Sequence, residues 1–283
     1  MTSTLCCAIL LLLTPSCGPL RYVSDQPAIT TSQWLAVART PGNQLSRPQG
    51  LTYARHLLFL TAHRNDRSSM IYAMDTTGSV LVQAALPSDA RHTSGLAWDG
   101  SFIWAVDFRS RMLYQIDIDS LQAGTLFLAA TYPTGLKHPS GLASLSIQKT
   151  PYLAISEFGF NAHTYIVPTA LLYTLAAASV PEIASLVYSN SGFSQGLTWD
   201  GRFLYEALNN MGTDRIEIID IAEAISTRNP GSIRRLGSFA AAGSAVEDLA
   251  FDGHTLWTTD EQDYYIHKLV SLDSVLNGFS LKQ

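Results

Sequence analysis

Acidic, amide and imidazole side chains recur at fixed distances from a repeated Gly-Leu pair in this 283-residue chain. Binding and catalytic pockets use such groups to hold a ligand or to move a proton. The residues immediately before each pair, or before its variant Asp-Leu, are Gln49, Ser94, Ser140, Gln195 and Glu247. The residues two positions earlier are Arg47, His92, His138, Phe193 and Ala245. A third set ends the second apolar run of each repeat: His63, Asp107, Glu157, Asn209 and Asp260.

The repeat predicts the elements that position these side chains. Its starts are Gly50-Leu51, Gly95-Leu96, Gly141-Leu142, Gly196-Leu197 and Asp248-Leu249, with spacings of 45, 46, 55 and 52 residues. An Asp-Gly pair and a second apolar run follow in three repeats, and this pattern predicts a hairpin because the tight turn needs positive φ. A third apolar run follows at residues 70–75, 112–117 and 215–220, and a fourth at residues 125–130 and 233–239. Four strands in about 45 residues are typical of one propeller blade, so the fold class is all-β.

Closure of the ring fixes the number of blades. The last repeat reaches Gln283 without a clear fourth strand, whereas residues 33–39 form an unassigned strand before the first repeat. If this N-terminal strand closes the last blade, the sheet has no open edge and five blades result. Six blades are less favoured, because the extra residues of the long repeats, 169–178 and 221–225, are rich in good helix formers. In either ring, the entry to each inner strand and the exit from each second strand lie on one face, around the mouth of the channel.

Composition excludes some classes of protein. Charged residues make up 14% of the chain and the net charge is −5, which argues against a nucleic-acid binder because that function needs a basic face. Hydrophobic residues make up 47%, enough for a packed core. No linker or low-complexity segment divides the chain after its leader, so residues 21–283 are expected to form one domain and a monomer.

Residues 1–20 are interpreted as a secretory signal peptide. The apolar run from Leu5 to Leu13 is about half the length that spans a bilayer, and no Lys or Arg precedes Arg21. The stretch from Leu13 to Gly18 resembles a loose bacterial lipobox, which implies lipidation at Cys17; plain cleavage nearby is the alternative. Both predict an extracytoplasmic protein, with membrane contact only through the leader or a lipid anchor.

The acids at the ends of the second runs have two interpretations. Residues 104–117, W-A-V-D-F-R-S-R-M-L-Y-Q-I-D, resemble the NHL-type and senescence-marker-protein-type propeller repeat, in which this Asp organises the following turn. Asp107 and Asp260 fit that role, whereas Glu157 departs from the repeat. Alternatively, these acids and Glu247 surround one opening and bind a cation, for which an oxygen-rich set favours Ca²⁺ over zinc. No cofactor is certain, and His92 and His138 lack the short spacing of a zinc motif.

One segment carries a sharper resemblance. Residues 193–210, F-S-Q-G-L-T-W-D-G-R-F-L-Y-E-A-L-N-N, are similar to the F-T-Q-G-L and Y-E-S-T signature of plant and bacterial glutaminyl-peptide cyclotransferases, which are five-bladed propellers. The resemblance implies that Phe193, Gln195 and Tyr205 line a pocket and that Glu206 transfers protons. It covers eighteen residues, and it falls in the fourth repeat where that family has it in an early blade.

The sequence therefore predicts an exported, lipid-anchored or cleaved, five-bladed β-propeller that binds a ligand at the channel mouth. The ligand is a small molecule, a peptide or a protein. The alternative is an enzyme, either a cyclotransferase or a lactonase or other hydrolase of the senescence-marker-protein type.

Overall fold

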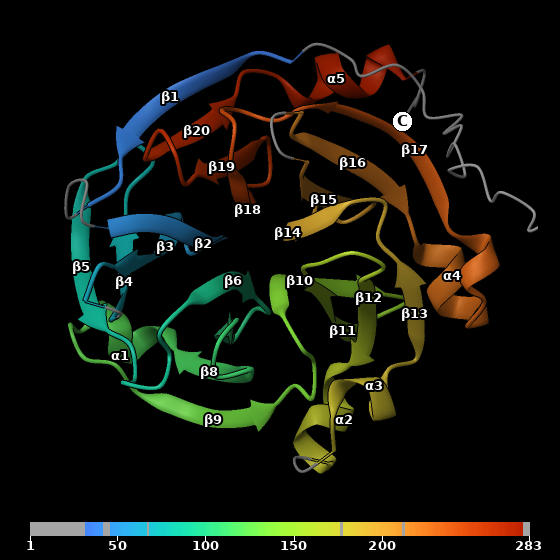
Figure 1. Cartoon of the computed structure of the whole chain (residues 1–283), viewed down its shortest axis with the longest axis horizontal. Coiled ribbons are helices and arrows are strands. Elements are labelled where there is room, and N and C mark those ends of the chain that lie inside the picture. Colours follow the sequence, from blue (N-terminus) through green and yellow to red (C-terminus); the bar gives the residue numbers. More distant parts are fainter. Residues whose placement is uncertain (1–31, 42–45, 67, 176–177, 211–212, 280–283) are drawn as a thin grey trace, which may run out of the picture.

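The computed structural model describes residues 32–41, 46–66, 68–175, 178–210 and 213–279. The predicted leader, residues 1–20, and Cys17 lie outside the described residues. Five antiparallel sheets of four strands each stand around a central axis, which confirms the five-bladed β-propeller (Figure 1). The short apolar runs with turn residues between them give this fold because each sheet buries both faces against its neighbours.

Each blade runs from an inner strand at the axis to an outer strand at the rim. Blade 1 consists of β2 (Ser46–Ala54), β3 (Leu57–Arg64), β4 (Ser69–Met74) and β5 (Val80–Ala85). Blade 2 consists of β6 (Thr93–Trp98), β7 (Phe102–Asp107), β8 (Met112–Asp117) and β9 (Leu128–Pro133). Blade 3 consists of β10 (Pro139–Ile147), β11 (Thr150–Glu157), β12 (His163–Pro168) and β13 (Leu186–Ser189). Blade 4 consists of β14 (Phe193–Trp199), β15 (Leu204–Asn209), β16 (Arg215–Asp220) and β17 (Arg234–Ala240). Blade 5 consists of β18 (Val246–Phe251), β19 (Leu256–Asp260), β20 (Tyr265–Leu269) and β1 (Trp34–Arg39).

The N-terminal strand closes blade 5, as the sequence predicted. β1 pairs antiparallel with β20, so that Trp34 lies opposite Leu269 and Arg39 opposite Tyr265. The Trp34 ring stacks on Phe239 of blade 4 at 6.5 Å between centroids, and its indole N–H donates to the carbonyl of Ala240 at 3.0 Å. The ring of blades is therefore held shut by residues from the two ends of the described chain.

Short helices follow the third strands of blades 2 to 5. They are α1 (Ile118–Gln122), α2 (Thr169–Thr174), α3 (Val180–Ile183), α4 (Ala222–Thr227) and α5 (Leu272–Gly278), with a 3₁₀ turn at Pro230–Ser232. α2 and α4 fall in the two segments where the sequence predicted helical insertions. Within the described part of the chain, no helix has the length and apolar character needed to cross a membrane.

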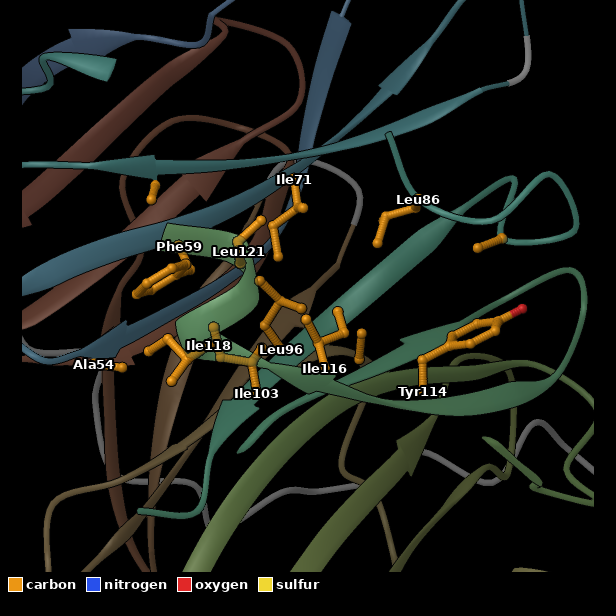
Figure 2. Close-up of a cluster of buried hydrophobic side chains, with 13 residues drawn as sticks. Ala54, Phe59, Ile71, Leu86, Leu96, Ile103, Tyr114, Ile116, Ile118 and Leu121 are labelled. Carbon is orange, nitrogen blue, oxygen red and sulfur yellow. The ribbon is translucent and has the colours of Figure 1, made fainter. Parts of the chain in front are cut away.

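The hydrophobic core is divided among the spaces between blades. Figure 2 shows the cluster between blades 1 and 2, where Phe59 and Ile71 of blade 1 pack with Leu96 and Ile103 of blade 2. All four are at most 1% exposed. Each such side chain contributes roughly 1.5–3 kcal/mol when it is fully buried. Because every blade is buried on both sides, losing one blade uncovers the core of two neighbours.

The inner strands approach one another so closely that their repeated glycine is required. A Cβ atom built on Gly95 of β6 would overlap the carbonyl oxygen of Ser140 on β10. The repeated Gly therefore marks the point of closest approach around the axis, and a larger side chain there would force the strands apart.

Candidate functional site at the channel mouth

Ten residues surround one end of the central channel, and we call them the mouth ring. In each blade, one residue precedes the inner strand or lies at its start, and one ends or directly follows the second strand. In order around the axis they are Arg47, His63, His92, Phe108, His138, Phe158, Phe193, Asn209, Ala245 and Glu261. Main-chain pairing joins the two members within a blade, as in the Phe108 N–H that donates to the carbonyl of His92 at 2.8 Å and the Glu261 N–H that donates to Ala245 at 2.9 Å.

A β-bulge in every inner strand sets this arrangement. In blade 1, Pro48 lies opposite Ala62 and Leu51 opposite Leu60, so Gln49 and Gly50 together face one residue, Thr61. The same irregularity occurs in the other four blades just before the Leu of the repeat. A bulge re-aims side chains and is common beside functional sites.

The register corrects the third set of residues predicted from sequence. Asp107, Glu157 and Asp260 lie opposite Thr93, Pro139 and Val246, two positions before the repeat start. The equivalent residues of blades 1 and 4 are Ala62 and Leu208. His63 and Asn209 therefore lie one position further along their second strands than Asp107, Glu157 and Asp260. Their equivalents in the other three blades are Phe108, Phe158 and Glu261, and the sequence analysis missed these three residues. They could have been found from the sequence by pairing each second strand with the residues before the Gly-Leu pair and allowing one extra residue for the bulge.

Six consecutive members of the mouth ring form an aromatic arc: His63, His92, Phe108, His138, Phe158 and Phe193. Ring centroids are 5.1 Å apart for His63 and His92, 5.3 Å for His92 and Phe108, and 5.1 Å for Phe108 and His138. Phe158 contacts Phe108 at 6.2 Å and Phe193 at 5.2 Å. The predicted residues His92, His138 and Phe193 thus share one continuous surface across blades 1 to 4. Such offset and edge contacts stabilise aromatic pairs by about 0.5–1.5 kcal/mol each.

The remaining members form a polar sector across blades 4, 5 and 1. Arg47 of blade 1 makes an ion pair with Glu261 of blade 5. Glu247 lies just inside, with 4% of its surface exposed. Burial, followed by repulsion from the Glu261 carboxylate, raises the pKa of Glu247 well above its usual range. One side of the mouth is therefore aromatic and the other carries closely spaced carboxyl groups.

Further along the axis lie the residues directly before each repeat start, and all of them except Gln195 are buried: Gln49, Ser94, Ser140, Gln195 and Glu247. The Ser140 hydroxyl donates to the side-chain oxygen of Gln195 at 3.0 Å, and the Ser94 hydroxyl donates to the carbonyl of Ser140 at 3.2 Å. The Gln49 amide nitrogen donates to the carbonyl of Pro48 at 3.0 Å.

Several buried polar atoms of this region lack a hydrogen-bond partner among the described residues. In blades 1 and 2 they include Oε1 of Gln49, Nδ1 of His63 and Nδ1 of His92, and in blade 4 Nδ2 of Asn210 also lacks one. Gln49 is only 1% exposed. Leaving a buried polar group without a partner costs about 1–3 kcal/mol. Burial, and then the neighbouring His63, lowers the pKa of His92 to about 4, so its imidazole is neutral at pH 7.

The acids Asp107 and Asp260 organise their own loops, which confirms the turn interpretation. Oδ1 of Asp107 accepts the N–H groups of Arg109 and Ser110, while Oδ2 accepts the His92 N–H at 2.6 Å and the Thr93 hydroxyl at 3.3 Å. In Asp260, each oxygen likewise accepts two backbone N–H groups. Four hydrogen bonds fill the lone pairs of a carboxylate. In the structure both side chains serve their own loops, and their part in ligand binding stays a prediction.

Glu157 takes the equivalent position in blade 3 with fewer contacts. Its Oε1 accepts the Lys137 N–H at 2.7 Å and the His138 N–H at 3.4 Å, and its Oε2 accepts the Tyr165 hydroxyl at 3.3 Å. It thus ties β11 to the loop before β10 and holds His138 in the aromatic arc.

Asp248 fills the axis of the propeller, a role that the sequence analysis missed. It stands where the other four repeats have Gly, and its carboxylate accepts the N–H groups of Leu51 at 2.8 Å, Leu96 at 3.1 Å and Leu249 at 2.9 Å. These three amides belong to blades 1, 2 and 5. The Asp in the place of a repeated Gly was the available signal. One buried carboxylate therefore joins several inner strands.

The two remaining residues of the cyclotransferase-like segment lie away from the mouth. The Tyr205 hydroxyl donates to Asp200 at 2.8 Å, just as the indole N–H groups of Trp104 and Trp257 donate to Asp99 at 2.7 Å and Asp252 at 2.8 Å. Tyr205 thus braces an Asp-Gly turn at the opposite end of the blade and is fully buried. Phe193 lies at the mouth and Tyr205 does not, so the structure does not bring these two residues together, and the pocket that the resemblance implies stays a prediction.

Glu206 is buried between blades 3 and 4. It lies opposite Leu197 and Glu217 in the sheet, so all three project from the same face, and Leu197 packs against Ala143 of blade 3. Its side chain is 0% exposed, and neither carboxylate oxygen has a hydrogen-bond partner in the described part of the chain. The nearest cation is Arg235, 3.8 Å away. Burial raises the pKa of Glu206 to about 7, opposed by Arg235 and reinforced by Glu217.

A small cavity of about 70 Å³ lies at the other end of the channel. Its lining includes the residues that follow the Gly-Leu pairs by two positions: Tyr53, Trp98, Ser144, Trp199 and Phe251. Ligand pockets measure about 300–1,000 Å³. This cavity has room for water molecules, so the mouth ring is the better candidate for a ligand site.

Comparison with solved structures finds the same architecture elsewhere. The crystal structure of Myxococcus xanthus glutaminyl cyclase aligns with a TM-score of 0.56 and 11% identity, over 85% of this chain and 97% of that one. The chain shares its propeller fold. A nidogen/laminin complex aligns at a TM-score of 0.47 with 16% identity over 76% of this chain and 73% of that one. Streptogramin B lyase aligns at 0.40 with 14% identity over 85% and 70%. No protein-family model matches the sequence, and no curated protein matches it.

Proposed function

We propose that this protein is an exported β-propeller binding module whose ligand occupies the mouth ring. The observation that carries the proposal is the group of unpartnered buried atoms on Gln49, His63 and His92. All three side chains lie in blades 1 and 2 at the mouth, and a ligand there supplies the missing hydrogen bonds. Loops on a rigid scaffold are the usual place for such sites.

The mouth has the composition of a binding surface. The aromatic arc supplies apolar contact area, and Gln49, Gln195 and Glu247 supply polar groups at its inner border. Ligand sites combine these two features, a mostly apolar lining and a few placed polar groups. Export rests on the leader sequence, residues 1–20, with lipidation at Cys17 as its membrane-anchored form.

The enzymatic alternative receives less support from the geometry. A general acid must reach the atom that it protonates, directly or through one water molecule. Glu206 is fully buried between two blades, and the Tyr205 hydroxyl is used by Asp200. Only Phe193 and Gln195 of the four resembling residues lie at the mouth.

Ligand-detected NMR with a fragment library tests the proposal on the purified protein. We expect fragments that bind the wild type to be lost in His92→Ala and kept in Ser144→Ala, a matched change at the other end of the channel. Melting curves check that both variants fold. Fragments that bind both variants equally, or an absence of bound fragments, would overturn the mouth site. Ammonia release from a Gln-initiated peptide, abolished in Glu206→Gln, would establish the enzyme instead.

Sequencing the N-terminus of the mature protein from its native host tests export. We expect a terminus at or near residue 18 or a blocked, lipid-modified Cys17. Cys17→Ser removes the modification in the second case and leaves secretion unchanged in the first. An intact Met1 terminus in the cytoplasm would contradict export.

A further inference from the structure

The unpartnered atoms on Gln49, His63 and His92 restrict the chemistry of the ligand. The Oε1 atom of Gln49 is an acceptor, and the amide nitrogen of the same side chain is already used by Pro48. An imidazole ring with its proton on Nε2 presents Nδ1 as an acceptor, and in that tautomer the Nδ1 atoms of His63 and His92 act like the Gln49 oxygen. A ligand that donates hydrogen bonds then satisfies all three atoms. An ammonium group has three donors and no acceptor.

The charges beside these acceptors favour the same ligand. Glu247 and Gln49 take equivalent positions in the neighbouring inner strands β18 and β2, and the Thr259 hydroxyl of blade 5 donates to the Gln49 carbonyl at 2.9 Å. Glu261 repels Glu247, and Asp248 and Asp260 add to the negative potential around it. Arg47 opposes this potential, but its guanidinium is paired with Glu261. These neighbours make the Glu247 carboxyl group hold its proton and share a hydrogen bond with Glu261. A bound cation favours the charged form of both glutamates, so an ammonium ion takes the place of that proton.

The aromatic arc begins at the same place. His92 belongs to the acceptor group and contacts Phe108 at 5.3 Å, from which the arc continues through Phe158 to Phe193. Aromatic rings attract cations and cover apolar groups. A ligand held by its ammonium group at Gln49 and His92 therefore finds an apolar surface for the rest of its body on one side.

We propose that the mouth binds a primary organic amine in its ammonium form, with an apolar or aromatic group next to the nitrogen. This inference rests on the proposed function and names its ligand class. The ammonium lies against Gln49, His63, His92 and the Glu247–Glu261 pair, and the apolar group lies along the Phe108, Phe158 and Phe193 rings. Among the described residues, no group of three or more His, Cys, Asp or Glu side chains is placed to hold a metal ion.

Calorimetry with three probes that share a phenyl group tests the inference: phenethylamine, 2-phenylethanol and phenylacetate. We expect phenethylamine to bind at least about tenfold more tightly than the alcohol, because its hydrogen bonds are charge-assisted, and phenylacetate to bind weakest. Glu247→Gln should weaken the amine about tenfold and change the alcohol less than about twofold. Phe158→Ala should weaken both the amine and the alcohol. Glu223→Gln, a carboxylate removed from the exposed surface of α4, is the matched control and should change neither.

The outcomes separate the ligand class from the site itself. If all three probes bind alike and Phe158→Ala weakens them alike, the mouth site stands and the amine inference is wrong. If no probe binds, or if neither Glu247→Gln nor Phe158→Ala changes the affinity of any probe, both the mouth site and the amine inference are wrong. Melting curves establish that each variant folds. Should Glu247→Gln fail to fold, Glu261→Gln replaces it, because that side chain is 25% exposed.

Discussion

Replacing Glu206 by Gln should stabilise the protein at alkaline pH. In the native state this carboxyl group is fully buried, lacks a hydrogen-bond partner among the described residues and lies 3.8 Å from Arg235. Arg235 is already engaged by Glu217 and donates to the Ser189 carbonyl at 2.7 Å. Gln keeps the shape of the side chain and removes the charge that must be buried.

The expected size follows from the pKa. Burial raises the pKa of Glu206 from 4.5 to about 7, so the folded protein holds this proton over a pH range in which the unfolded chain has released it. Below about pH 4.5 both states are protonated, and the wild type pays no penalty for a buried charge. Stability is lost as the pH rises through this window, and above about pH 7 the loss is about 3 kcal/mol, since each pKa unit corresponds to about 1.4 kcal/mol. The Gln variant lacks this loss.

Urea denaturation of both proteins between pH 4.5 and 8.5 measures the effect. We expect the free energy of unfolding of Glu206→Gln, relative to wild type, to increase by about 3 kcal/mol across this range. Groups that titrate in both proteins cancel in the difference. Glu217→Gln is the control: its carboxylate accepts hydrogen bonds from Arg215 and Arg235, so removing it should destabilise the protein. A pH-independent difference for Glu206→Gln, or a loss of stability at pH 8, would refute this account of the buried carboxyl group.

Three further predictions concern the frame of the propeller. Deleting residues 1–39 removes β1 and exposes the edge of β20, so the protein should lose its cooperative melting transition. Deleting residues 1–20 should leave that transition unchanged. A protein that lacks residues 1–39 but stays monomeric, with an unaltered melting temperature, would contradict closure by β1. Asp248→Gly leaves the amides of Leu51 and Leu96 without their acceptor, so the free energy of unfolding measured with urea should fall by at least about 2 kcal/mol. Added formate should restore part of this stability. An unchanged denaturation midpoint would show that the axial carboxylate contributes nothing. Because the lone pairs of Asp107 and Asp260 are filled, the melting temperature in excess calcium should equal that in chelator. A melting temperature that rises with calcium in the wild type, and does not rise in Glu157→Gln, would reveal a calcium site.

The candidate site was partly visible in the sequence. The positions before each Gly-Leu pair were predicted to lie together on one face, because strands that alternate in direction bring equivalent residues to one face; that they bind a ligand stays a prediction. On the second strands, His63 and Asn209 lie at the level of the mouth, whereas Asp107, Glu157 and Asp260 lie one residue before it. The bulge beside each repeat start changes the register, and strand lengths estimated from apolar runs do not reveal it. Phe108, Phe158 and Glu261 were missed for this reason.

By itself, the sequence determined the number of blades, the order of their strands and the closure by β1. These features follow from local signals that need no partner to be recognised: a repeated Gly where inner strands meet, Asp-Gly turns, and period-two apolar runs. The tertiary structure alone decided what each polar side chain faces. Glu206 was expected at a pocket, and in the structure it lies between two blades. Asp248 stands where the other repeats have Gly, and its carboxylate accepts hydrogen bonds from amides of three blades. The physical reason is that those contacts join segments up to 197 residues apart, as between Leu51 and Asp248, and depend on the facing of strands in neighbouring sheets.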